Sequence, residues 1–258
     1  MATAAYSLRV EEVEHYTESY FRFRLERPED FRFTSGQFVM VGLMVDDKPL
    51  MRAYSIANPY WDEGLEFYSI IIPDGQLTSR LRHIKVGDEV ILSDRAVGTL
   101  TLNPLGPGGK RLFMLSTGTG VAPFASIIRD DETYEAFDEV YLTQTCRYAA
   151  DLQYAQQRVT EAMACPLVGE EAQKKLRFYG SVTREPHEHQ GRITNLIASG
   201  ELFTHLGIPA FNPETDRVLI CGSMEMLKDT QKLLDERGFV RGFGHKPAGY
   251  VWERAFTG

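Results

Sequence analysis

The first hundred residues show the alternating hydrophobic pattern of β-strands. In the segment YFRFRLER (residues 20–27), Phe21, Phe23 and Leu25 alternate with charged side chains. A period of two places the apolar residues on one face, as in a half-buried strand. Further strands are predicted at residues 7–13, 38–43, 52–56, 65–72 and 89–92, with a short helix at 78–84. Many short strands separated by turn residues indicate an antiparallel β-barrel.

The pattern changes after the loop-like segment NPLGPGG at residues 103–109. Strands are predicted at residues 111–115, 139–143, 176–179, 216–221 and 249–253, and helices up to residue 128, at 150–162 and at 224–237. Strands that alternate with helices indicate a parallel, doubly wound sheet. We therefore predict two domains: an antiparallel β-barrel over residues 1–105 and an α/β doubly wound parallel-sheet domain over residues 106–258.

Composition and charge narrow the function classes. The chain has 258 residues, 25% of them charged, and a net charge of −8, which argues against general affinity for nucleic acid. The three cysteines are an odd number and lie far apart, so we expect no disulfide framework, zinc site or iron–sulfur cluster. Neither a membrane-spanning apolar run nor a signal peptide is visible. We expect a monomeric cytoplasmic protein that binds no metal.

The first motif with chemistry is Arg52-Ala53-Tyr54-Ser55 on a predicted strand. Residues at i and i+2 share a face, so Arg52 and Tyr54 can point into one cleft. The guanidinium suits a phosphate, the ring can stack, and the Ser55 hydroxyl can donate or accept. Taken alone, these residues are more simply explained by an ordinary strand with a surface arginine.

The second motif, PDGQLTS at residues 73–79, is a turn that opens a short helix. Free amides at the start of a helix attract anions. A capped surface helix that binds nothing is the simpler explanation of this motif alone.

The third motif, STGTGVAPF at residues 116–124, follows a strand and opens a helix. Gly118 and Gly120 in that context indicate a nucleotide-phosphate loop, although Pro123 stands where the usual fingerprint has a third glycine. A tight structural turn is the alternative.

The fourth motif, Cys221-Gly222-Ser223-Met224, also directly follows a strand. Two such loops at strand ends of one parallel sheet would flank one crevice. A buried structural cysteine is the more common role for Cys221 by itself.

Together, RxYS, PDGxLTSRL, GTGxxPF and CGSxxM, in this order and at these intervals, resemble the ferredoxin–NADP reductase family, most closely its bacterial ferredoxin/flavodoxin reductases. The resemblance covers residues 7–256. It implies that the barrel binds FAD and that the rear domain binds NADP(H). The FAD residues that it implies are Arg52, Ala53, Tyr54, Ser55, Tyr68, Gln76, Leu77, Thr78, Thr119 and, from the C-terminal tail, Ala255 and Phe256.

For NADP(H), the resemblance implies Gly118, Gly120, Cys221 and Gly222 near the pyrophosphate and nicotinamide, and Arg147, Arg184 and Arg192 at the 2′-phosphate. Because an extra phosphate needs arginine or lysine, we expect a strong preference for NADPH. Solvated surface arginines are the alternative. The resemblance also implies that Ser55, Cys221 and Glu253 orient the nicotinamide and act as the catalytic residues.

The implied reaction is hydride transfer between NADPH and FAD N5, followed by single-electron transfer to ferredoxin or flavodoxin. Without an iron–sulfur cluster in the chain, the one-electron centre must lie on that separate partner. We expect its docking site to be basic, with Arg22, Arg24, Arg80 and Arg82 as candidates. The alternatives are an oxygenase reductase component, a free flavin reductase, or a flavin-holding redox sensor that is not an enzyme.

Overall fold

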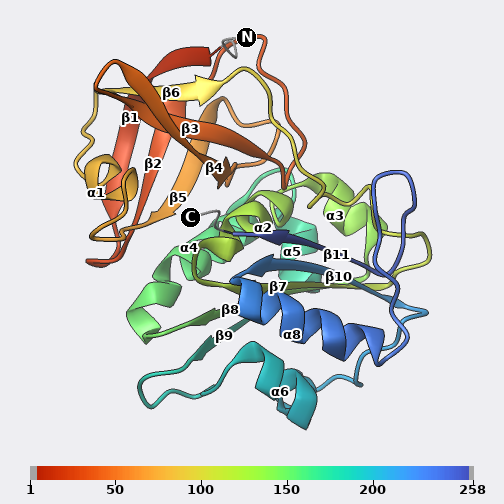
Figure 1. Cartoon of the computed structure of the whole chain (residues 1–258). Coiled ribbons are helices and arrows are strands. Elements are labelled where there is room, and N and C mark those ends of the chain that lie inside the picture. Colours follow the sequence, from red (N-terminus) through yellow and green to blue (C-terminus); the bar gives the residue numbers. More distant parts are fainter. Residues whose placement is uncertain (1–4, 256–258) are drawn as a thin grey trace.

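The computed structural model describes residues 5–255 and contains a barrel domain followed by an α/β domain (Figure 1). Six antiparallel strands form the barrel in the order β4-β3-β6-β1-β2-β5. The apolar residues Phe21, Phe23 and Leu25 of the predicted alternation are fully buried, as expected. The elements are β1 (Ala5–His15), β2 (Tyr20–Glu26), β3 (Phe38–Val45), β4 (Lys48–Ser55), β5 (Gly64–Ile70), α1 (Thr78–Leu81) and β6 (Glu89–Ser93).

A tight turn explains why β4 begins earlier than predicted. Asp46 and Asp47 have φ angles of 50° and 59°, in the left-handed region. Two such residues in succession form the kind of two-residue turn that joins antiparallel strands. The strands on either side therefore pair up to the turn itself, from Val45 opposite Lys48 to Phe38 opposite Ser55.

The second domain has a parallel sheet of five strands in the order β11-β10-β7-β8-β9. The strands are β7 (Arg111–Thr117), β8 (Glu139–Cys146), β9 (Leu176–Val182), β10 (Asp216–Gly222) and β11 (Tyr250–Arg254). The helices are α2 (Ala122–Ile127), α3 (Asp131–Ala136), α4 (Gln153–Ala164), α5 (Gly169–Lys175), α6 (Ile193–Ser199), α7 (Glu201–Leu206) and α8 (Met224–Asp235), with 3₁₀ turns at Gly118–Val121 and Ala149–Leu152. The sequence did not predict α3, α5, α6 or α7.

Alternate residues of each central strand enter different layers, because successive side chains point to opposite faces. Leu112 and Met114 of β7 pack in a cluster with residues of α2, α4 and α5. Phe113 and Leu115 pack in a second cluster with residues of α6, α7 and α8. Helices thus cover both faces of the sheet, and the prediction of a doubly wound fold is confirmed (Figure 1).

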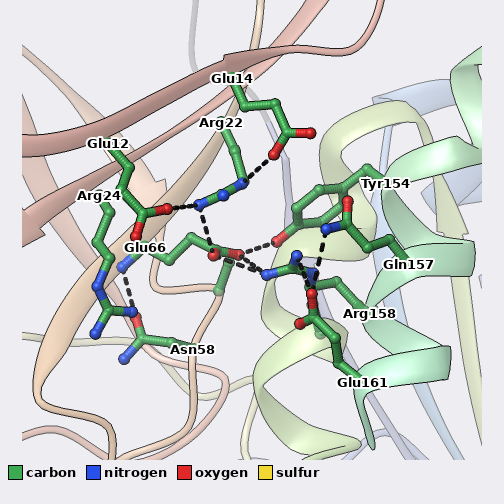
Figure 2. Close-up of polar contacts among 12 residues, drawn as sticks. Glu12, Glu14, Arg22, Arg24, Asn58, Glu66, Tyr154, Gln157, Arg158 and Glu161 are labelled. Atoms are coloured by element: carbon green, nitrogen blue, oxygen red, sulfur yellow. Dashed lines mark hydrogen bonds and ion pairs between the residues drawn. The ribbon is translucent and has the colours of Figure 1, made fainter. Parts of the chain in front are cut away.

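Figure 2 shows a buried polar cluster where β5 of the barrel meets α4 of the rear domain. The carboxylate of Glu66 accepts two hydrogen bonds from Arg158 Nη1, at 2.8 and 3.0 Å, and one from the hydroxyl of Tyr154 at 2.8 Å. Arg22 Nη1 approaches the same carboxylate at 3.5 Å. Glu66 and Arg158 are each only 4% exposed, so this ion pair joins the two domains away from water.

The connection between the domains runs from the end of β6 to the start of β7. The amide of Gly106 donates to the carbonyl of Ala248 at 2.8 Å, and the Ala248 amide donates to the carbonyl of Pro104 at 3.0 Å. The connection therefore already packs on the α/β domain, and the boundary between residues 105 and 106 stays a prediction. Within residues 5–255, no helix is long and apolar enough to cross a membrane.

Candidate cofactor and nucleotide sites

A cavity of about 430 Å³ lies between β4, β5, the start of α1 and the rear domain. It brings together ten of the eleven residues predicted for the flavin site. They are Arg52, Ala53, Tyr54, Ser55, Tyr68, Gln76, Leu77, Thr78, Thr119 and Ala255. Phe256 lies outside the described residues. We call this space the first cavity.

Tyr54 forms a fixed aromatic wall of the first cavity. Its hydroxyl is 3.0 Å from the hydroxyl of Ser69 on β5, and its ring packs edge-on against Phe67. Burial raises the pKa of Tyr54 to about 12, so the hydroxyl stays protonated at neutral pH. The side chain offers a neutral, flat surface on which a planar ring can stack.

Arg52 supplies positive charge to the same cavity. Its guanidinium donates to Gln76 Oε1 at 3.3 Å and to the carbonyl of Met51 at 2.9 Å. Within residues 5–255, Arg52 forms no ion pair with a carboxylate. Its charge is therefore available to a phosphate, and a flat ring beside a guanidinium that no carboxylate neutralises fits a flavin nucleotide.

Tyr68 links the first cavity to the junction between the domains. Its ring is stacked on Tyr154 of α4, with centroids 3.9 Å apart and planes 6° apart. The ring of Tyr20 on β2 also stacks with Tyr68, with centroids 5.6 Å apart. The cavity wall is therefore continuous with the Glu66–Arg158 cluster, through Tyr154.

A second cavity of about 340 Å³ lies at the carboxyl ends of the parallel strands. Of the predicted nucleotide residues, Gly118, Arg147 and Arg192 line it. Arg184 does not line it but is adjacent, because its amide donates to the carbonyl of Arg147 at 3.0 Å. The carboxyl end of such a sheet is where open α/β folds bind ligands.

The glycines of the third motif are required by the backbone. Gly118 has a φ of 55°, a conformation that side chains disfavour. A Cβ atom at Gly120 would collide with the carbonyl oxygen of Cys221, because the turns after β7 and β10 touch there. The two strand-end loops therefore touch, and Gly118 of one and Ser223 of the other line the second cavity.

Cys221, Gly222 and Glu253 line neither cavity. The Cys221 side chain is 2% exposed in the hydrophobic core, and burial raises the pKa of its thiol above the usual range. Burial also raises the pKa of Glu253, whose carboxylate accepts hydrogen bonds from the Thr99 hydroxyl at 3.1 Å and the Leu100 amide at 3.2 Å. Glu253 thus ties β11 to the connection between β6 and β7. The catalytic roles of Cys221 and Glu253 stay predictions.

The two cavities are neighbours. Ile70 lines both, and of two successive residues Gly118 lines the second cavity and Thr119 the first. The sequence did not predict apolar wall residues such as Ile70 and Ile72, which no motif distinguishes from core. It also missed Tyr20, Thr194 and Ser223 of the second cavity. Only Ser223 had a signal, since it belongs to the fourth motif.

Comparisons with known proteins agree with this arrangement. Residues 7–94 match the oxidoreductase FAD-binding domain family, and residues 114–232 match the oxidoreductase NAD-binding domain family. The chain is 52% identical over 250 residues to a flavodoxin/ferredoxin–NADP reductase of Rhodobacter capsulatus, covering 96% of this chain and 92% of that protein. It is 47% identical over 253 residues to a ferredoxin–NADP reductase of Pseudomonas aeruginosa, covering 98% of each.

A solved structure is similar over almost the whole chain. The ferredoxin NADP+ reductase from Neisseria gonorrhoeae, with bound FAD and NADP, matches with a TM-score of 0.87 and 28% identity, over 98% of this chain and 99% of that one. The barrel, the parallel sheet and the two adjacent cavities define a two-domain flavin oxidoreductase. The chain belongs to the ferredoxin–NADP reductase family.

Proposed function

We propose that the protein transfers electrons between NADP(H) and a one-electron carrier, ferredoxin or flavodoxin, with FAD as its resident cofactor. The observation that carries this proposal is the adjacency of the two cavities across Gly118 and Thr119. A nicotinamide nucleotide in the second cavity would lie next to a flavin in the first. The curated relatives with about 50% identity, all named for this reaction, support it.

In the first cavity, Arg52 would neutralise a phosphate of FAD, Tyr54 would offer its ring to the flavin and Ser55 would offer a hydroxyl. When bound, FAD accepts a hydride and releases its electrons singly. The chain contributes position, charge and exclusion of water. Thr119 and Ala255 close the cavity from the rear domain.

In the second cavity, Arg147 and Arg192 support a preference for the 2′-phosphate of NADPH, with Arg184 beside them. All three follow the carboxyl end of β8 or β9 and are exposed. We expect Arg192→Ala and Arg147→Ala each to lower the NADPH-to-NADH ratio of kcat/KM about tenfold. Arg177→Ala is the matched control, because Arg177 is an exposed arginine near the opposite end of β9. If the ratio is unchanged in both test variants, the assignment of these arginines to the 2′-phosphate is contradicted.

The main experiment is a steady-state assay of the purified yellow protein after its flavin has been extracted and identified. NADPH oxidation is followed with ferricyanide and then with a ferredoxin or flavodoxin. We expect FAD, and turnover with each acceptor. A redox sensor would turn over poorly with all of them, and a free flavin reductase would need added flavin. Either result would contradict the proposal.

Two arginines of the predicted docking site form ion pairs within the barrel. Arg22 pairs with Glu12 and Glu14, and Arg24 pairs with Asp62, so their charges are neutralised within the barrel. These ion pairs count against a role of the two arginines in docking an acidic partner, which stays a prediction.

Arg80 and Arg82 form no ion pair within residues 5–255 and remain the candidates. We expect added salt to lower turnover with ferredoxin but not with a neutral quinone. If turnover with ferredoxin does not depend on salt, the proposal of a basic docking site is contradicted. A monomeric state, a cytoplasmic location and the lack of nucleic-acid binding stay predictions.

A further inference from the structure

An ion pair spans two walls of the second cavity. Arg192, just before α6, donates from Nη1 to Oε1 of Glu225, in the first turn of α8, at 2.8 Å. Both residues line the cavity. Their side chains are 60% and 68% exposed, so the pair is held by its two charges and not by burial.

The carboxylate of Glu225 accepts a hydrogen bond from the guanidinium group of Arg192, and this is the group that would bind a 2′-phosphate. A phosphate bound by Arg192 through two parallel hydrogen bonds either takes over Nη1 or lies beside the carboxylate. In the first case the ion pair is lost, and in the second two anions are brought close together. Both outcomes raise the free energy of the phosphate-bound state relative to the free protein.

We propose that Glu225 is a specificity-determining residue that competes with the 2′-phosphate for Arg192 and so weakens binding of 2′-phosphorylated nicotinamide nucleotides. The inference rests on the proposed function, because it takes Arg192 as a ligand of that phosphate. Arg147, the other arginine of the cavity, forms no ion pair within residues 5–255, so Glu225 acts through Arg192.

The expected size of the change in affinity follows from the exposure of the ion pair. An exposed ion pair changes an equilibrium by up to about fivefold. Glu225→Gln keeps the shape of the side chain and removes the charge, so we expect it to bind NADP+ about twofold to fivefold more tightly. Binding of NAD+, which lacks the 2′-phosphate, should stay the same.

Asp229 provides the matched control. It lies one turn further along α8 and lines the same cavity, but within residues 5–255 it forms no ion pair. Asp229→Asn therefore removes an equal charge from the cavity without freeing Arg192. We expect it to change the affinity for NADP+ less than Glu225→Gln does.

The test is a double-mutant cycle on the FAD-loaded protein. Dissociation constants for NADP+ and 2′-phospho-AMP are measured by titration calorimetry, and that for NAD+ by competition with NADP+. The proteins are wild type, Glu225→Gln, Arg192→Ala, the double variant and Asp229→Asn. A melting curve of each variant verifies that it is folded. In the Arg192→Ala background, Glu225→Gln should no longer tighten binding of NADP+.

The outcomes separate the two proposals. If Arg192→Ala leaves NADP+ binding unchanged, the assignment of Arg192 under the proposed function fails. If Arg192→Ala weakens binding but Glu225→Gln does not strengthen it, the competition is overturned and the proposed function stands. Three other results would also overturn the competition. Glu225→Gln could strengthen binding of NAD+ as much as that of NADP+, or strengthen binding of NADP+ as much in the Arg192→Ala background as in wild type. Asp229→Asn could also strengthen binding of NADP+ as much as Glu225→Gln does.

Discussion

The Glu66–Arg158 ion pair allows a quantitative test of how the two domains are joined. Arg158→Met would leave the Glu66 carboxylate, which is 4% exposed, with only the Tyr154 hydroxyl and Arg22, at 3.5 Å, as side-chain partners among residues 5–255. Removing one partner of a buried ion pair typically costs 3–5 kcal/mol. Because Arg22 compensates in part, we expect about 3 kcal/mol. For a chain of this size, that lowers the melting temperature by roughly 6–12 °C.

The assay is thermal unfolding of the FAD-loaded protein, followed by circular dichroism and by flavin release. The double variant Glu66→Gln/Arg158→Met removes both charges and should recover most of the lost stability, because no buried charge is left unpaired. Lys174→Met is the control, since its ion pair with Glu170 is exposed and contributes less than about 1 kcal/mol. The reasoning would be refuted if Arg158→Met melted within 2 °C of wild type, or if the double variant melted no higher than Arg158→Met.

Three further predictions concern the cavities and β11. Tyr54→Phe should retain FAD, whereas Tyr54→Ala should bind it at least about tenfold more weakly in an equilibrium titration, because the stacking ring is lost; equal retention would contradict the stacking. Iodoacetamide at pH 8 should label the partly exposed Cys165 and spare Cys221 until the protein is denatured, because burial raises the pKa of that thiol; rapid labelling of Cys221 in a peptide mass map would show otherwise. The folded-state pKa of Glu253 is raised by burial, so its carboxyl contributes stability at low pH that is lost as pH rises through that value. Glu253→Gln should therefore melt progressively higher than wild type as pH increases from about 4.5, and a difference that does not vary with pH would contradict this.

Local patterns were enough to predict the barrel and the central sheet. Alternation at Phe21, Phe23 and Leu25, and the apolar strands of the rear domain, are signals that each segment carries by itself. The helices α3, α5, α6 and α7 have only six or seven residues, too few for two full turns of an amphipathic pattern. Their ends are set by packing in the layers above and below the sheet, which no local pattern records.

The residues of the candidate sites also fall into those that the sequence predicts and those that it does not. Residues in motifs, such as Arg52 and Tyr54, could be found because the four motifs together resemble a known family; alone, they are more simply explained by an ordinary strand. Ile70 could not, since an apolar residue on a strand indicates core whether or not a cavity adjoins it. The ion pair between Glu66 and Arg158 joins residues 92 positions apart, and neither has a neighbour in sequence that signals the other.

The spacing of the two cavities depends on residues outside the motifs. On one side of the junction, Glu66 binds Arg158, and close by the Ser126 hydroxyl donates to the carbonyl of Asn58 at 2.8 Å. Near the end of the chain, Glu253 holds the last strand to the connection between β6 and β7. Because these anchors lie at separate points of the junction, a rotation of one domain against the other must break at least one of them. The motifs therefore supply the chemistry of each cavity, while these buried contacts fix the distance between the cavities.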